Sequence, residues 1–174
     1  MLPRICGLAQ YRRVNFREKL VAWDDLQRWG DAFRKSGRRL VATNGCFDLL
    51  HPGHVTYLEA ARNQGDALLI GVTGDEGVRN LKGAGRPVNE ETDRALVLAA
   101  LESVSGVCVF PDRTAMRFLE RARPNIYVKG GDYTIDTINQ EERRFVESIG
   151  GRVVILANVP GKSTSATLAK IAGL

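Results

Sequence analysis

The apolar residues of this chain fall into short runs that are separated by longer amphipathic stretches. Each run has the length of a buried strand, and most are rich in branched side chains. The predicted strands cover residues 39–42, 67–72, 104–110, 124–128 and 152–156. Between them, apolar residues recur at helical spacing and glycines often mark the ends. The predicted helices cover residues 55–65, 75–81, 89–101, 114–123, 141–150 and 166–172.

The regular alternation of strands and helices predicts the fold class. It indicates an α/β protein with a Rossmann-like, doubly wound parallel sheet of about five strands. In such sheets, ligands bind at the carboxyl ends of the strands. The glycines do not form the Gly-x-Gly-x-x-Gly pattern of dinucleotide oxidoreductases, and Gly161-Lys162-Ser163 lacks the upstream glycine of a P-loop. We therefore set both of those nucleotide sites aside.

The amino-terminal residues follow a different pattern. Residues 1–21 show no clean periodicity, and we interpret them as an extension. Residues 22–174 then form a single domain, with a leading helix over 22–37 and a core over 38–174. Trp23, Trp29 and Phe33 share one face of the leading helix. We expect the two tryptophans to join this helix to the domain or to a second subunit, and we expect a homodimer or a higher homo-oligomer.

Charge and cysteine content narrow the function classes. The net charge is +5, but residues 1–40 hold ten Lys and Arg against four Asp and Glu, whereas residues 41–174 hold fifteen against sixteen. The core domain therefore lacks the basic excess expected of a nucleic-acid partner. No apolar run is long enough for a membrane span. Three widely spaced cysteines indicate neither disulfides nor a zinc site, so we expect a cytoplasmic protein.

The residues with the clearest chemistry follow the first predicted strand, in Thr43-Asn44-Gly45-Cys46-Phe47-Asp48-Leu49-Leu50-His51-Pro52-Gly53-His54. We expect Asn44-Gly45 to allow a sharp turn and Gly53 to let a ligand approach the start of the next helix. The first N–H groups of a helix are unpaired and carry partial positive charge, which suits a phosphate. His51 and His54 are the only histidines in the chain and could donate to the same anion. Cys46 is predicted to be a small packing residue rather than a nucleophile.

These residues also carry a resemblance to a known family. The sequence His51-Pro52-Gly53-His54 matches the His-x-Gly-His motif of the nucleotidylyltransferase superfamily. The wider Asn-Gly-Cys-Phe-Asp run resembles the bacterial heptose 1-phosphate adenylyltransferases, and the resemblance continues to the end of the chain. It implies that His51 and His54 are catalytic and that Asn44, Gly45, Cys46, Phe47 and Gly53 bind nucleotide.

Two further loops contain basic residues and glycines. The loop of residues 82–88 is either a solvated surface loop or a lid whose Lys82 and Arg86 close over phosphates. Relatives carry a similar Leu-Lys-Gly-x-x-Arg-Pro, and we assign Lys82 a catalytic role and Arg86 a role in substrate binding. Arg94, on the next helix, is either functional or a structural ion-pair residue. Asp48 is expected to orient the loop or to bind a sugar hydroxyl.

The segment Lys129-Gly130-Gly131-Asp132-Tyr133 ends the fourth predicted strand, and its match to the heptose enzymes is complete. Glycines there could let backbone amides reach a ligand, and Lys129 could meet a phosphate. We assign Gly131 and Asp132 to nucleotide and Lys129 and Tyr133 to the sugar phosphate. The resemblance also implies that hydroxyls at the last helix start hold the distal phosphates. Ser163 and Thr164 match there; the third position is serine instead of threonine.

The resemblance implies transfer of AMP from ATP to D-glycero-D-manno-heptose 1-phosphate, giving ADP-heptose for bacterial lipopolysaccharide. Mg²⁺ is expected with ATP, held mainly by phosphate oxygens and water, because no protein metal site is visible. Related chains often follow a sugar kinase, and we expect that kinase to be separate here. The alternatives are a cytidylyltransferase for glycerol 3-phosphate or a similar small phosphate, and a non-catalytic nucleotide-binding regulatory module.

Overall fold

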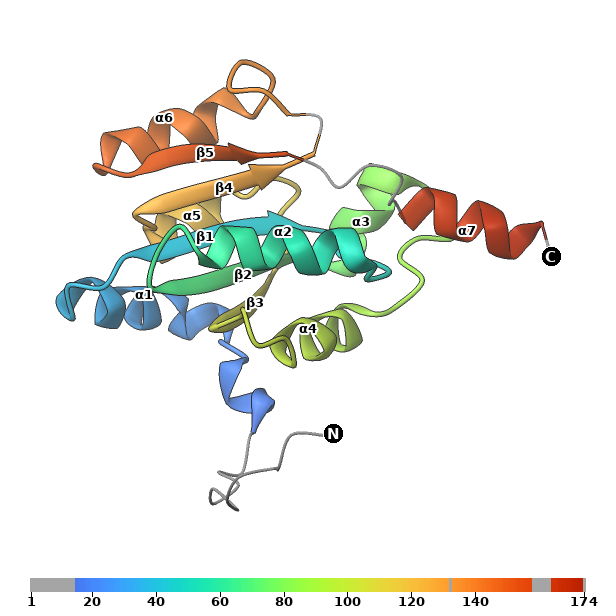
Figure 1. Cartoon of the computed structure of the whole chain (residues 1–174), viewed down its shortest axis with the longest axis horizontal. Coiled ribbons are helices and arrows are strands. Elements are labelled where there is room, and N and C mark those ends of the chain that lie inside the picture. The colour runs from blue at the N-terminus through green and yellow to red at the C-terminus, as the bar shows by residue number, and fades with distance from the viewer. Residues whose placement is uncertain (1–14, 132, 158–163, 174) are drawn as a thin grey trace, which may run out of the picture.

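The computed structural model describes residues 15–131, 133–157 and 164–173. Five strands form one sheet in the order β3-β2-β1-β4-β5, and every pairing is parallel (Figure 1). The strands are β1 (Leu40–Gly45), β2 (Ala67–Thr73), β3 (Gly106–Phe110), β4 (Ile126–Gly130) and β5 (Arg152–Leu156). The predicted fold class is confirmed.

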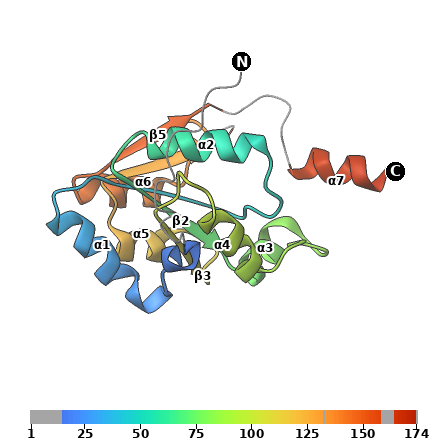
Figure 2. The same ribbon diagram turned by 60° about the horizontal axis from the view of Figure 1, so that its bottom comes forward.

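The helices cover both faces of this sheet (Figure 2). They are α1 (Leu26–Lys35), α2 (Pro52–Arg62), α3 (Asp75–Lys82), α4 (Glu91–Ala99), α5 (Met116–Ala122), α6 (Gln140–Ser148) and α7 (Thr164–Ala172), with short 3₁₀ helices η1 (Phe16–Lys19) and η2 (Trp23–Asp25). Helices α1, α5 and α6 lie on one face, and α2 and α4 lie on the other. None of the helices that the structure describes is long and apolar enough to cross a membrane.

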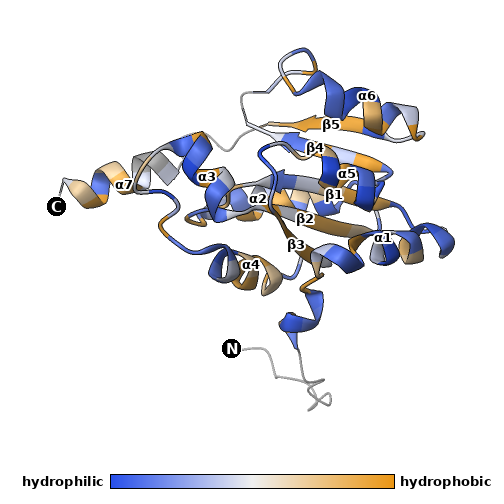
Figure 3. Cartoon of the chain, turned by 180° about the vertical axis from the view of Figure 1, so that it is seen from behind, coloured by the Kyte–Doolittle hydropathy of each residue, from blue (hydrophilic) through white to orange (hydrophobic). Residues whose placement is uncertain are grey.

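Alternation along β1 divides the core into two layers, because successive strand residues point to opposite faces. Leu40 and Ala42 pack with Leu26 and Phe118 from α1 and α5, whereas Val41 packs with residues of α2 and α4. Strands β3 and β5 are apolar along most of their length, as their orange colour in Figure 3 shows. Burial of β1 between two neighbours and two helix layers fixes the position of the loop that follows it.

The structure differs from the sequence prediction at the end of β1. Parallel pairing with β2 continues through Gly45, which lies opposite Val72, so Asn44 and Gly45 belong to the strand and not to a turn. The sharp change of direction occurs at Phe47, whose φ of 46° is in the left-handed region. An aromatic residue adopts this conformation at a cost of about 1–2 kcal/mol. Strain of this kind is often found at functional sites.

Part of the expected amino-terminal extension contacts the core. Leu20 forms a parallel bridge with Val107, and the Val21 amide donates to the Val107 carbonyl at 2.8 Å. Trp23 and Trp29 pack against the core on the α1 face, which confirms their predicted role in joining the leading helix to the domain. Residues 1–14 of the extension lie outside the described residues.

Candidate active site

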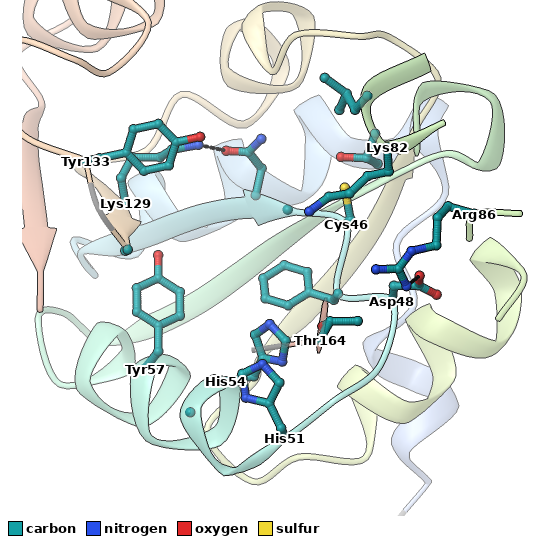
Figure 4. A pocket seen from close by; sticks show the side chains of 18 residues that line it. Cys46, Asp48, His51, His54, Tyr57, Lys82, Arg86, Lys129, Tyr133 and Thr164 are labelled. Carbon is teal, nitrogen blue, oxygen red and sulfur yellow. Dashed lines mark hydrogen bonds and ion pairs between the residues drawn. The ribbon is translucent and has the colours of Figure 1, made fainter. Parts of the chain in front are cut away.

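A pocket of about 550 Å³ opens at the carboxyl ends of the central strands (Figure 4). Its walls contain predicted site residues from four separate segments of the chain. Those present are Asn44, Gly45, Cys46, Phe47, Asp48, His51, Gly53, His54, Lys82, Arg86, Lys129, Gly131, Tyr133 and Thr164. Asp132 and Ser163, which we also assigned to nucleotide, lie outside the described residues. The parallel topology brings the others together, because the strands all end at the same edge.

The two histidines lie at the start of α2. His51 is the N-cap in extended backbone, Pro52 occupies the first turn, and the His54 amide donates to the His51 carbonyl at 2.9 Å. Proline suits this position because its fixed φ is already helical and it has no N–H to satisfy. The two imidazole rings stack with centroids 3.8 Å apart, and the Phe47 ring meets His54 edge-on at 5.4 Å. The strained residue therefore supports a catalytic candidate directly.

The environment of His54 keeps its ring neutral. Burial, together with the nearby His51 and Lys82, lowers the pKa of His54 from 6.5 to about 4. A neutral imidazole has one N–H donor and one acceptor nitrogen. At neutral pH, His54 can thus offer an anion one hydrogen bond but no positive charge, and the charge must come from other residues.

Asp48 ties the predicted lid to the loop of residues 46–51, which leads to the histidines and is called the histidine loop below. The Asp48 carboxylate accepts from the Arg86 guanidinium at 2.5 Å and from the Val88 and Asn89 amides at 2.7 and 3.2 Å. Both members of the ion pair are largely buried, with side-chain exposures of 13% and 5%. In this structure Arg86 is thus bound by the protein itself, whereas Lys82 is exposed at the pocket rim.

Arg94 has a structural role. Its side chain is fully buried and donates to the Asp75 carboxylate at 2.7 Å, to the Cys46 carbonyl at 2.5 Å and to the Asn89 carbonyl at 3.0 Å. These contacts join α4 to α3 and to the loop after β1. Of the two roles that we left open for Arg94, the contacts support the structural ion pair.

Lys129 enters the pocket from the end of β4. Its ammonium donates to the Asn44 side-chain oxygen at 3.0 Å and lies 5.2 Å from the centre of the Tyr133 ring. Burial lowers the pKa of Lys129, while the negative charge of Glu142 raises it. No carboxylate among the described residues lies within ion-pair distance of Lys129. Its charge is therefore available to a ligand.

Gly130 has a different role from the one expected. A Cβ at this position would lie 2.5 Å from the Tyr57 ring, so the missing side chain makes room for Tyr57. Only Gly131, with φ of 100°, needs glycine for its backbone. The Tyr57 hydroxyl bonds with Thr43 at 2.7 Å and donates to the Val128 carbonyl at 3.1 Å.

Sequence reasoning missed some pocket residues, notably Tyr57, Thr73 and Leu81. Tyr57 lies three residues after His54, on the same face of α2, and this spacing could have identified it. Among the predicted residues, Thr164 at the start of α7 donates its hydroxyl to the Leu49 carbonyl at 3.2 Å. Cys46 also lines the pocket, and burial raises the pKa of its thiol, which keeps it protonated at neutral pH.

The described residues do not offer a protein site for Mg²⁺. Asp48 is the one carboxylate among the residues that line the described pocket, and its oxygens are occupied by Arg86 and by two backbone amides. Mg²⁺ prefers carboxylate, phosphate and water oxygens in octahedral geometry. An ion that arrived with a nucleotide would thus have to rely on phosphate and water.

The parallel sheet, the histidines at the helix start and the cationic pocket define a nucleotidyltransferase-type α/β domain. The chain belongs to the cytidylyltransferase-like family, whose model matches residues 42–170. The chain is similar to proteins named bifunctional protein HldE. It is 51% identical to the one from Mesorhizobium japonicum over 140 residues, 80% of this chain and 28% of that protein. It is 50% identical to the one from Acidiphilium cryptum over 160 residues, 92% of this chain and 31% of that protein. The chain thus spans under a third of the length of these relatives.

Solved structures support the same fold. A lipopolysaccharide core biosynthesis protein from Thermoplasma volcanium matches with a TM-score of 0.59 and 26% identity, over 71% of this chain and 98% of that one. A pantoate–β-alanine ligase from Francisella tularensis matches with a TM-score of 0.58, over 84% of this chain and 69% of that one. The second pair is only 11% identical, so it shows the fold alone.

Proposed function

We propose that this chain transfers AMP from ATP to D-glycero-D-manno-heptose 1-phosphate, producing ADP-heptose and pyrophosphate for bacterial surface glycans. The observation that carries the proposal is the pocket itself. It combines a helix start and two stacked histidines with two lysines that have no carboxylate partner among the described residues. The resemblance of the Asn-Gly-Cys-Phe-Asp and Lys-Gly-Gly-Asp-Tyr segments to heptose 1-phosphate adenylyltransferases supports the choice of substrates, as do the HldE relatives.

The chemistry is a substitution at phosphorus. A phosphate oxygen of the sugar phosphate forms a bond to the α-phosphorus of ATP, the bond from that phosphorus to the bridging β-phosphate oxygen breaks, and pyrophosphate leaves with its electron pair. Both reactants are anions, so the protein must bring them together in line and stabilise the charge that spreads over the phosphoryl oxygens. Fixed hydrogen-bond donors and positive charges can do this without a covalent intermediate.

The pocket suggests a role for each wall. His51, His54 and the amides at the start of α2 would hold the triphosphate and the transition state. Lys82, at the rim on the opposite side from Lys129, would neutralise the departing pyrophosphate. Lys129 and Tyr133 would hold the sugar phosphate, and Thr164 would contact the nucleotide's distal phosphates. Asp48 and Arg86 would fix the lid against the histidine loop rather than bind phosphate themselves.

The test is pyrophosphate release with ATP or CTP against a panel of phosphates that includes heptose 1-phosphate and glycerol 3-phosphate, with products identified by mass spectrometry. We expect turnover with ATP and heptose 1-phosphate above every other pair. Preference for CTP and glycerol 3-phosphate would instead establish the cytidylyltransferase alternative. Nucleotide binding without turnover on any acceptor would support a regulatory module.

The expectations about partners stay predictions. These are a homodimer or higher homo-oligomer, a separate sugar kinase that supplies the phosphate, and a cytoplasmic location. The relatives are named bifunctional, and the matched part is under a third of each, so a second activity accompanies this domain in those proteins. Sedimentation of the purified chain would test the oligomeric state.

A further inference from the structure

Glu142 on α6 is a buried acidic residue outside the pocket lining. It is 5% exposed, and its carboxylate oxygens accept from the Ala115 amide and the Tyr127 hydroxyl, each at 2.9 Å. No Lys or Arg of the described ranges lies within ion-pair distance of it. Burying a carboxylate is costly without compensation. A buried, charged Glu142 therefore needs a positive charge nearby to compensate for it.

The compensating charge is reached through two neutral groups. The Tyr127 hydroxyl lies 2.6 Å from the Asn44 side-chain oxygen, and the Lys129 ammonium donates to that same oxygen at 3.0 Å. Burial and the adjacent Glu142 raise the pKa of Tyr127 well above 10, so its hydroxyl stays neutral. A continuous series of contacts therefore runs from Glu142 through Tyr127 and Asn44 to Lys129. Lys129 itself lines the pocket (Figure 4).

We propose that Glu142 is a positioning residue for Lys129 and that it acts through Tyr127 and Asn44. Its negative charge favours the protonated ammonium in a half-buried place, and the hydrogen bond to Asn44 fixes where that ammonium sits. A direct ion pair with Glu142 would neutralise Lys129, as the ion pair with Asp48 neutralises Arg86. With two neutral groups between them, Lys129 stays charged and free to meet an anion.

The first test follows the titration of Lys129 and needs no turnover. The groups that face Lys129 are Glu142, Cys46, Tyr127 and Tyr133. The rate at which an acetylating reagent modifies Lys129 is measured against pH by mass spectrometry. The variant Glu142→Gln removes the charge but keeps the contacts, because a glutamine carbonyl can accept from the Ala115 amide while its NH₂ donates to Tyr127.

We expect the apparent pKa of Lys129 to fall in Glu142→Gln, because the charge that raises it is lost. The matched control is Glu141→Gln on the exposed side of the same helix, which should titrate like the wild type. A Lys129 titration in Glu142→Gln that equals the wild type would overturn the proposal, whatever the activity of the variant.

The second test rests on the proposed function and measures kinetics. We expect Glu142→Gln and Tyr127→Phe each to raise the KM for heptose 1-phosphate about 10-fold, the effect of a lost charge-assisted contact, with ATP affinity within about threefold of wild type. If Glu142→Gln fails to fold, Tyr127→Phe decides, and an unchanged KM would overturn the proposal. If the wild type itself shows no turnover, the proposed function fails, while the Lys129 titration still decides the role of Glu142.

Discussion

Arg86 and Lys129 lie on opposite walls of the same pocket, yet their charges are used differently. The Arg86 guanidinium is bonded to the Asp48 carboxylate at 2.5 Å, whereas the Lys129 ammonium is bonded to the neutral side chain of Asn44. The charge of Arg86 is neutralised within the protein, whereas the charge of Lys129 is available to a ligand. A basic residue in a phosphate site can therefore serve either to hold a loop or to bind an anion, and its partner decides which.

The same comparison extends around the pocket. Arg94, like Arg86, is matched by a carboxylate, whereas Lys82, like Lys129, has none within ion-pair distance in the described part of the chain. His54 forms a third class, because it is neutral. Removing a matched cation should chiefly harm the fold, removing an unmatched one should chiefly harm binding, and removing a neutral donor should chiefly harm turnover.

The largest effect is expected for the buried matched cation. Arg94→Met would leave the Asp75 carboxylate and the Cys46 carbonyl without their partner, which should lower the free energy of unfolding by about 3 kcal/mol or more. Urea denaturation measures this. Arg79→Met, at an exposed position of α3, is the control and should change stability by less than about 0.5 kcal/mol. Equal stability of the two variants would show that the ion pair of Arg94 with Asp75 does not stabilise the fold.

The next effect concerns the neutral donor. His54→Ala should lower kcat about 10²-fold or more, the cost of one lost oxyanion-type donor, while ATP affinity by calorimetry changes little. Near-normal kcat would contradict the assignment.

The pH dependence gives an independent check of the same residue. The folded pKa of His54, about 4, lies below its unfolded value of 6.5, so the unfolded chain binds the extra proton first. Stability should therefore decrease as pH falls from about 6.5 toward 4, and His54→Asn should flatten that decrease. Turnover of the wild type should likewise show no acid limb near pH 6.5 caused by His54.

A smaller effect, on ligand binding, should distinguish Lys82 from Arg86 in the lid. Lys82→Gln should weaken ATP or pyrophosphate binding by about 1.5–3 kcal/mol and reduce the salt dependence of that binding. The double variant Asp48→Asn/Arg86→Gln removes a matched pair and keeps the net charge. We expect its binding to retain the wild-type salt dependence. If its salt dependence instead falls as in Lys82→Gln, Arg86 also meets phosphate.

The smallest effect is expected at Cys46, which contributes neither charge nor a reactive thiolate. Because burial raises the pKa of its thiol, iodoacetamide should modify it slowly at pH 7. Cys46→Ala should keep kcat/KM within about threefold of wild type. Rapid alkylation with complete loss of turnover would show that the thiol takes part.

Much of this could be predicted from sequence, for identifiable reasons. The apolar runs and glycines predicted the parallel sheet, and the shared strand edge then brought Lys82, Lys129 and the histidines to one pocket. The partners of the charged residues could not be predicted. Asp48 and Arg86 are 38 residues apart, and Glu142 and Tyr127 are on different elements, so only the packed structure shows which charges neutralise each other. The left-handed Phe47 also escaped prediction, because its neighbour Gly45 carried the usual signal for a turn.

The central place of β1 in the sheet has a consequence for how the protein opens. Its residues pair with β2 on one side and β4 on the other, and Leu40–Ala42 are fully buried. Amide hydrogens there should exchange with deuterated water only through global unfolding, whereas those of exposed residues 83–85 should exchange through local opening. The loop that carries Asp48 and leads to the histidines is thus attached to one of the last segments to open, while residues 83–85 of the lid can fluctuate without breaking the contacts between Arg86 and Asp48.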